Sequence, residues 1–255
     1  MRRRDLLLGT LVLLAAWQAL SWVVSSGVLP LRTRAEFLPG PIQVFPVFFQ
    51  QLPRELGGHL VVSTWRVVAS MLLAVGLAVP AGLVMGQSRA VNRLLSPLVY
   101  LTYPVPKVVL VPVVVLFFGV GDLGKIVVIT LILFFQILVL VRDAAATLRS
   151  ELIQSVRSLG AGRRALFFYV YLPASLPAVL TALRVSVGTA VAVLYVAELY
   201  ATQKGLGYYI FLQGSTFFNY PAMYAGIVAM ALLGLGLYFA VDWLEHWLCP
   251  WEFVS

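Results

Sequence analysis

The sequence is poor in charged residues and in cysteine. Charged residues make up 11% of its 255 positions, whereas about 25% is usual in soluble domains, and 61% are hydrophobic. A soluble domain of this length cannot cover that much apolar surface, so the composition predicts an integral membrane protein. The single cysteine, Cys249, excludes a disulfide within the chain. A glycine-rich phosphate loop, a zinc-type Cys/His cluster and a G-x-S-x-G motif are all missing, so we expect no cofactor in this chain.

The net charge of +8 does not indicate a nucleic-acid-binding protein. The arginines lie at the ends of hydrophobic runs, where lipid headgroups are found, and do not form one basic patch. We therefore expect a lipid bilayer, and no nucleic acid, around the chain.

Six hydrophobic runs predict an all-α, polytopic membrane protein with six transmembrane helices. Their approximate ranges are 6–24, 60–85, 94–120, 126–141, 174–199 and 222–247. The first run follows three arginines, as in a signal peptide, but no clear small-x-small cleavage site follows promptly, so we interpret it as a retained span. Residues 1–255 then form a single transmembrane domain. In the second span, Gly82 and Gly86 form G-x-x-x-G, which we interpret as helix packing within the subunit.

Prolines predict where the helices are interrupted, because proline lacks the backbone N–H. The third span contains four of them: Pro97, Pro104, Pro106 and Pro112. Pro173 and Pro177 are expected to separate a helix over 161–171 from the fifth span. A short interfacial helix over 42–56 and a half-buried helix within 201–221 complete the expected elements.

The positive-inside rule predicts the orientation of the six spans. Ten cations lie on the side of the N-terminus: Arg2, Arg3, Arg4, Arg89, Arg93, Arg142, Arg149, Arg157, Arg163 and Arg164. Five lie on the other side: Arg32, Arg34, Arg54, Lys125 and Lys204. Both termini and the loop 143–173 are therefore expected in the cytoplasm.

The most informative loop runs from Arg149 to Pro173. Apolar residues at helical spacing predict one face of a short helix: Leu152, Ile153, Val156 and Leu159. The other face is polar: Glu151, Gln154, Ser155, Arg157 and Ser158. Gly160 is expected to end the helix, since glycine adopts a left-handed turn without a Cβ penalty. The spacing fits a docking element and fits a plain connecting loop about equally well.

These residues resemble the coupling loop of bacterial ABC importer permeases. That motif has the form E-A-A, three residues, G, nine residues, I-x-L-P. Here Gly160 is followed by nine residues and then by V-Y-L-P at 170–173, while the E-A-A triplet is replaced by Q-S-V at 154–156. The departure leaves the helix–glycine–helix form but removes the carboxylate at Gln154. R-S-L-G-A at 157–161 is itself typical of this family.

Further motifs resemble the nitrate/sulfonate/taurine branch of these permeases. They are L-P-G-P at 38–41, H-L-V-V-S-T-W-R at 59–66, L-F-F-G-V-G-D-L-G-K at 116–125, A-E at 197–198 and G-L-G-Y at 205–208. The resemblance implies the type I importer fold, a homodimer in a bacterial cytoplasmic membrane, and a periplasmic or extracellular solute-binding protein. It also implies a cytoplasmic ATPase dimer, which binds the ATP and Mg that this chain does not.

The same resemblance assigns roles to residues of the loop. The positions expected to contact the ATPase are Glu151, Leu152, Gln154, Ser155, Val156, Leu159, Gly160, Ala161, Leu172 and Pro173. Substrates in this branch are small anions or organic acids such as nitrate, sulfonates and taurine.

Four charged residues fall within the hydrophobic spans, where charge is costly and usually faces the bundle or a water path. They are Arg66, Lys107, Arg184 and Glu198. Arg66 and Glu198 lie in the outer third of their spans, so we expect them to pair or to gate the outer mouth. Lys107 and Arg184 are candidates for assisting an anion. A structural ion pair or snorkelling to the headgroups is the alternative for each.

Two other classes of protein remain as alternatives. An intramembrane enzyme would need a catalytic pair within the spans, but His59 and His246 lie at span ends and no intramembrane aspartate pair exists. A standalone channel or secondary transporter would act without an ATPase, and it would leave the loop 143–173 unexplained.

Overall fold

The computed structural model describes residues 3–26, 37–200 and 202–253, and these residues form helices and connecting segments with no strand among them. The chain divides into two compact units. Unit 1 consists of Met1–Ser63 and Thr202–Leu232, and unit 2 of Thr64–Ala201 and Leu233–Ser255. Two long helices, α3 (Gly57–Gln87) and α11 (Tyr220–Leu248), contribute to both units.

Unit 1 contains the first helices of the chain and the segment after the fifth span. Its other helices are α1 (Arg3–Ser25), α2 (Pro41–Gln51) and α10 (Leu206–Phe211), with π-helical turns at η2 (Leu52–Leu56) and η5 (Leu212–Thr216). Ser21 of α1 donates a hydrogen bond to the Leu38 carbonyl at 2.8 Å. The helices expected over 42–56 and within 201–221 are therefore both present, and Arg54 (φ −106°, ψ −105°) marks the kink where η2 passes into α3.

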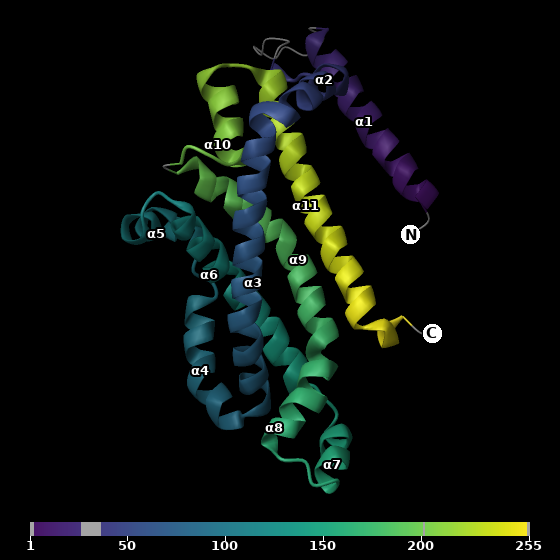
Figure 1. The fold of residues 1–255 in the computed structure, drawn as a ribbon, viewed down its shortest axis with the longest axis vertical. Coiled ribbons are helices and arrows are strands. Elements are labelled where there is room, and N and C mark those ends of the chain that lie inside the picture. Colours follow the sequence, from purple (N-terminus) through teal and green to yellow (C-terminus); the bar gives the residue numbers. More distant parts are fainter. Residues whose placement is uncertain (1–2, 27–36, 201, 254–255) are drawn as a thin grey trace. The chain divides into compact units, whose positions relative to one another are not determined.

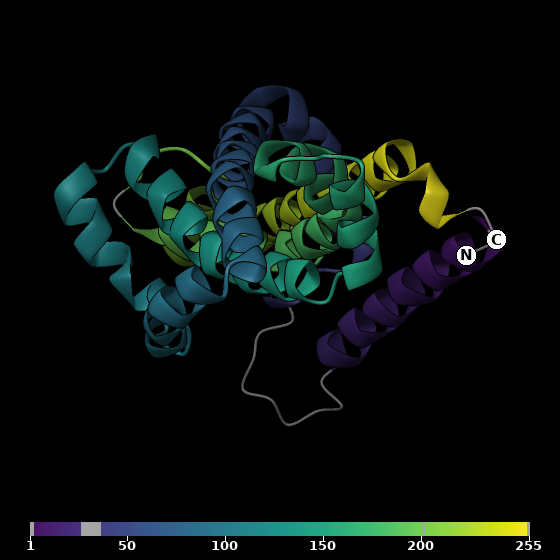
Figure 2. The ribbon, with the colours of Figure 1, turned by 90° about the horizontal axis from the view of Figure 1, so that it is seen from below.

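Unit 2 is organised around α6 (Asp122–Ala146) and α9 (Leu172–Leu199), which contact each other extensively and lie side by side in Figures 1 and 2. The core that they share with α3 is apolar: Leu83, Ile129, Leu133, Ile137, Ala190 and Leu194. Gly86 of α3 lies so close to α6 that an added Cβ would be 2.6 Å from Ala145 Cβ and from the Arg142 carbonyl. The predicted role of the glycine pair in packing within the subunit is thus confirmed.

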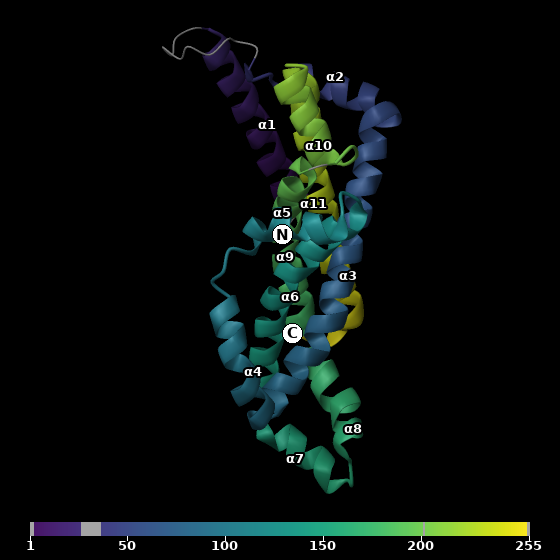
Figure 3. The ribbon, with the colours of Figure 1, turned by 90° about the vertical axis from the view of Figure 1, so that its left-hand side faces the viewer.

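The third predicted span is not one helix. It consists of α4 (Arg89–Thr102), η3 (Lys107–Leu110) and α5 (Val111–Phe118), and the two halves are bent by 79° across a short break (Figure 3). Only Pro104 and Pro106 lie in the break; Pro97 is accommodated inside α4, and Pro112 lies in the first turn of α5, where its missing N–H has no helical partner to lose. Among the described residues, five helices are long and apolar enough to cross a membrane, or six if the bent pair counts as one span.

The expectation that Pro173 and Pro177 interrupt the helix before the fifth span is wrong. Helical structure continues from α8 (Arg163–Leu166) through the π-helical η4 (Phe167–Tyr171) into α9. In η4 the Leu172 N–H donates to the Phe167 carbonyl, five residues back. The wider turn lies immediately before Pro173 and makes room for a ring that would clash with the preceding turn of a regular α-helix.

Three cations used to assign the orientation, Arg2, Arg32 and Arg34, lie outside the described residues. The other predicted spans correspond to α1, α3, α6, α9 and α11, each extending a few residues beyond the hydrophobic run.

Candidate functional site

The loop predicted to dock a partner has the helix–glycine–helix form. Helix α7 (Ser150–Ser158) ends at Leu159, and Gly160 follows with φ +84°, in the left-handed region. The Gly160 N–H donates to the Arg157 carbonyl at 2.9 Å, and the Ala161 N–H to the Val156 carbonyl at 3.4 Å. These bonds close the helix and turn the chain back into α8, as Figure 3 shows.

The predicted apolar face of α7 is divided between internal packing and exposure. Ile153 and Val156 pack against Leu166, Val170 and Tyr171 of the following helix. Leu159 by contrast is 86% exposed, and Leu152 is 49% exposed. Internal packing therefore explains Ile153 and Val156, whereas Leu152 and Leu159 are exposed at the two ends of the helix.

The other predicted contact residues are divided in the same way: Leu172 packs against the apolar core of unit 2, and Ala161 packs against the cluster that contains Leu166. Glu151, Gln154 and Ser155 are exposed on α7. A cavity of about 360 Å³ brings Leu152, Val156 and Pro173 together with Trp251 from the C-terminal segment. Trp251 had no predicted role, because only the tertiary fold returns the end of the chain to this loop.

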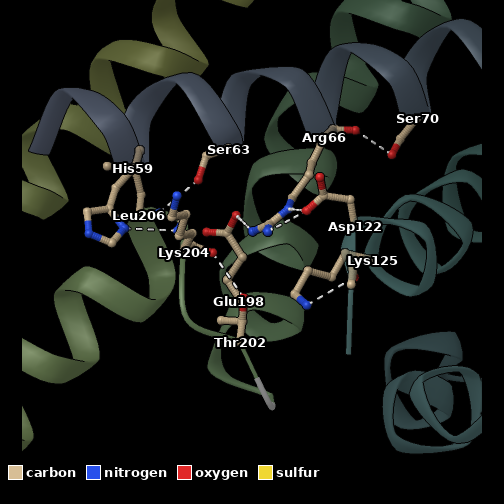
Figure 4. Close-up of polar contacts among 12 residues, drawn as sticks. His59, Ser63, Arg66, Ser70, Asp122, Lys125, Glu198, Thr202, Lys204 and Leu206 are labelled. Atoms are coloured by element: carbon tan, nitrogen blue, oxygen red, sulfur yellow. Dashed lines mark hydrogen bonds and ion pairs between the residues drawn. The ribbon is translucent and has the colours of Figure 1, made fainter. Parts of the chain in front are cut away.

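The second feature is a buried charge cluster at one end of α6 and α9 (Figure 4). The Arg66 guanidinium donates to Glu198 Oε1 at 2.7 Å and to Asp122 Oδ1 at 2.6 Å. The Arg66 side chain is 4% exposed and that of Glu198 is fully buried, whereas Asp122 is 48% exposed. The predicted pairing of Arg66 with Glu198 is confirmed, and it joins three helices, because α3, α9 and α6 each supply one member.

Lys125 completes this cluster. Its Nζ donates to the Val120 carbonyl at 2.7 Å and to the Gly121 carbonyl at 3.3 Å. The whole residue is only 1% exposed. Lys125 therefore stabilises the glycine-rich turn that precedes α6. Lys125 was predicted only as a cation outside the spans and Asp122 had no predicted role, although their position in the L-F-F-G-V-G-D-L-G-K motif was a signal.

Within unit 1, two side chains of α3 bind the start of α10. The Gly205 N–H donates to His59 Nδ1 at 3.0 Å, and the Leu206 N–H donates to Ser63 Oγ at 2.8 Å. His59, which had no assigned ligand set, thus closes the turn at Gly205, whose φ is +127°. The motifs at 59–66 and 205–208 meet in unit 1, just as those at 116–125 and 197–198 meet in unit 2.

Arg184 lies in a separate ion-pair cluster. Its Nη1 is 2.7 Å from Asp242 Oδ1 and 2.9 Å from Glu245 Oε2, and Thr181 donates to Glu245 Oε1 at 3.3 Å. Two carboxylates therefore balance its charge, which favours the structural alternative over assistance to an anion.

Lys107 lies beside the break between α4 and α5. Its Nζ donates to the carbonyls of Thr102 and Tyr103 at 2.8 Å and 3.1 Å, and it lies 4.7 Å from the centre of the Phe135 ring. Among the described residues no group of three or more His, Cys, Asp or Glu side chains is placed to hold a metal ion.

These features define a class: a polytopic, helical membrane protein with a broken span, buried intramembrane charges and an exposed helix–glycine–helix loop. Residues 78–251 match the family described as binding-protein-dependent transport system inner membrane component, and the chain belongs to that family. It is therefore a permease component of an ABC importer.

Curated relatives cover nearly the whole chain. The taurine transport system permease protein TauC of Escherichia coli is 33% identical, over 98% of this chain and 91% of that protein. The putative aliphatic sulfonates transport permease protein SsuC of Bacillus subtilis is 31% identical over 94% and 85%. The formylaminopyrimidine transport permease protein ThiX of Halalkalibacterium halodurans is 30% identical over 84% and 86%.

A solved structure supports the fold. A chain of the MetNI methionine ABC transporter, in an inward-facing conformation, superposes with a TM-score of 0.64 at 19% identity, covering 74% of this chain and 94% of that chain. The expected importer permease fold is thus confirmed.

Proposed function

We propose that two copies of this chain form the translocation pathway of an ATP-driven importer of a small anion or organic acid, such as nitrate, a sulfonate or taurine, and that cytoplasmic ATPases drive it through the loop 151–173. The substrate class follows from relatives named for taurine and aliphatic sulfonates. ATP and Mg are bound by the ATPase partner, and a periplasmic or extracellular binding protein delivers the solute. The positive-inside pattern supports cytoplasmic termini.

The observation that carries this proposal is the exposure of Leu159 beside Gly160. A leucine that is 86% exposed at the closed end of an otherwise packed helical hairpin loses the stabilisation that burial gives, about 1.5–3 kcal/mol. A partner surface that covers Leu159 and Leu152 recovers that energy. The left-handed Gly160 fixes the angle at which α7 is presented, so movement of the partner is transmitted to α9 as a rigid lever.

The test is to compare Leu159→Glu with Ser158→Glu, which adds the same charge at the neighbouring exposed position. Leu159→Glu places a carboxylate in the expected apolar contact, and we expect co-purification of the ATPase to fall at least about tenfold. Ser158→Glu is expected to retain most of the ATPase. Membrane abundance of both variants controls for folding, and sulfonate uptake into proteoliposomes that contain ATP gives the functional readout.

Full ATPase binding and normal uptake by Leu159→Glu would show that α7 is not the coupling surface. Uphill uptake by liposomes that contain this chain alone would favour the alternative, a standalone channel or secondary transporter.

A further inference from the structure

The break between α4 and α5 borders an open cavity that no assigned role explains. Its volume is about 330 Å³, and all of its lining belongs to unit 2. The lining residues are Tyr103, Val105, Lys107, Val108, Ile132, Phe135, Gln136 and Val193. The volume lies at the lower end of the range of small-molecule sites, so it fits a small solute and no large one.

The cavity is open to the surface of unit 2 and lies beside the middle of α6. Ile132 and Gln136 are ten and fourteen residues along α6 from Asp122, which corresponds to about 15–20 Å along the helix axis. That places them near the middle of a hydrocarbon layer of about 30 Å. Non-helical backbone at such depth occurs only where protein buries it or where it borders a water-filled cavity. Residues 103–106 are non-helical, and Tyr103 and Val105 line the cavity.

Lys107 brings a full positive charge to this apolar site. Its ammonium group donates to carbonyls of the break, which carry only partial charges, at 2.8 Å and 3.1 Å. In the part of the chain that the structure describes, no carboxylate forms an ion pair with it. Arg66 and Arg184 by contrast each contact two carboxylates. A cation with no counter-charge at membrane depth attracts an anion.

The rest of the lining defines what kind of anion fits. Aliphatic side chains and the Phe135 ring form most of the wall, and Gln136 supplies an amide that can donate to an acid oxygen. Neither aspartate nor glutamate is among the lining residues, so an ammonium group on the solute would meet Lys107 with no carboxylate to offset it.

We propose that this cavity binds the transported solute and selects a monoanionic organic acid with an aliphatic body, such as an alkanesulfonate, over a zwitterion such as taurine. Lys107 and Gln136 hold the acid group, and Val108, Ile132 and Val193 contact the chain. The inference rests on the proposed import function and adds a selectivity step inside the permease to that of the binding protein.

The test uses a thiol introduced by Gln136→Cys in the detergent-purified complex of permease and ATPase. Two methanethiosulfonate reagents of similar size are compared: the sulfonatoethyl reagent is an anion and the trimethylammonioethyl reagent is a cation. With either one, the introduced thiolate forms a mixed disulfide and releases methanesulfinate. Rates are divided by those for free mercaptoethanol. The wild-type chain measures the background of Cys249, which is fully buried.

We expect the anionic reagent to be favoured by at least about tenfold, and the preference to be lost when Lys107→Gln is added. Hexanesulfonate should slow the reaction of the introduced thiol with the anionic reagent, at concentrations where taurine does not slow it. The matched control is Lys204→Gln, which removes the same charge from an exposed residue of unit 1 and should leave the preference unchanged.

An unchanged preference in Gln136→Cys with Lys107→Gln, or equal protection by taurine, would overturn the proposal. If Gln136→Cys does not assemble, the same measurement is made with Ile132→Cys, one turn away on the same face of α6. ATPase co-purification with the wild-type chain, and uptake by that wild-type complex in proteoliposomes, separate the two claims. Failure of both refutes the import function, whereas intact uptake with no charge preference refutes only the anion site.

Discussion

The buried cluster around Arg66 predicts an order of stabilities that depends on burial. Replacing Arg66 with Met removes the ion pair of the fully buried Glu198, and breaking a buried ion pair in this way costs about 3–5 kcal/mol. Asp122 binds the same guanidinium at a similar distance but is 48% exposed, so water screens it and Asp122→Asn should cost only about 1 kcal/mol. Glu198→Gln should lie between them, because it leaves Arg66 and Lys125 together with only Asp122.

The assay is reversible unfolding of the purified protein in mixed micelles, followed by circular dichroism, with double-mutant cycles for the two pairs. The Arg66–Glu198 coupling energy should exceed the Arg66–Asp122 coupling by about 1.5 kcal/mol or more. The double variant Arg66→Met with Glu198→Gln should be more stable than Arg66→Met alone, since it also removes the buried negative charge of Glu198 that has lost its ion pair with Arg66.

Equal costs for Asp122→Asn and Glu198→Gln would refute this reasoning, because burial would then not decide the energies. Additivity of Arg66→Met and Glu198→Gln would refute it equally, because the two residues would not act as a pair.

Four further predictions, three on substitutions and one on thiol labelling, test other parts of the structure. Gly86→Ala should destabilise the protein by about 1–3 kcal/mol, because its Cβ would be 2.6 Å from atoms of α6. Gly76→Ala is the control and should not destabilise the protein, since no atom lies within 4 Å of the new Cβ. Thermal unfolding compares the two variants. Gly160→Ala should cost about 1–2 kcal/mol from its positive φ alone and reduce ATPase co-purification. Arg184→Gln should lower membrane abundance by breaking its ion pairs and leave uptake per folded molecule unchanged; reduced uptake at full abundance would restore its predicted pathway role. Burial, with Glu245 and Glu252 nearby, raises the pKa of the Cys249 thiol, so maleimide at pH 7 should label it slowly in the folded protein and rapidly in denaturant.

The local order of the chain follows from its sequence. Uninterrupted apolar runs predicted the long helices, because a backbone in hydrocarbon must satisfy its own hydrogen bonds. The left-handed Gly160 and the amphipathic α7 were predicted from spacing alone, since a helix terminus is decided within about four residues. The break near Pro104 was predicted for the same reason.

The prolines show where prediction from local sequence fails. Pro104 and Pro106 break a span, whereas Pro173 and Pro177 lie within a continuous helix. Sequence alone did not separate the two cases, because η4 absorbs the ring of Pro173 by widening the preceding turn. That adjustment also positions Val170 and Tyr171 against α7, a packing gain which no local rule contains.

The amino-acid sequence by itself determined the membrane class, the long helices, the glycine-closed loop and the presence of charges at membrane depth. The tertiary structure added Asp122 to the predicted pair of Arg66 and Glu198, and it alone paired Arg184 with carboxylates from α11. Ion pairing depends on side chains 56 to 132 positions apart meeting within hydrogen-bond distance, and helix packing sets that separation where residue spacing does not. For the same reason, only the fold reveals that Lys107 lies beside a cavity and forms no ion pair with a carboxylate of the described residues.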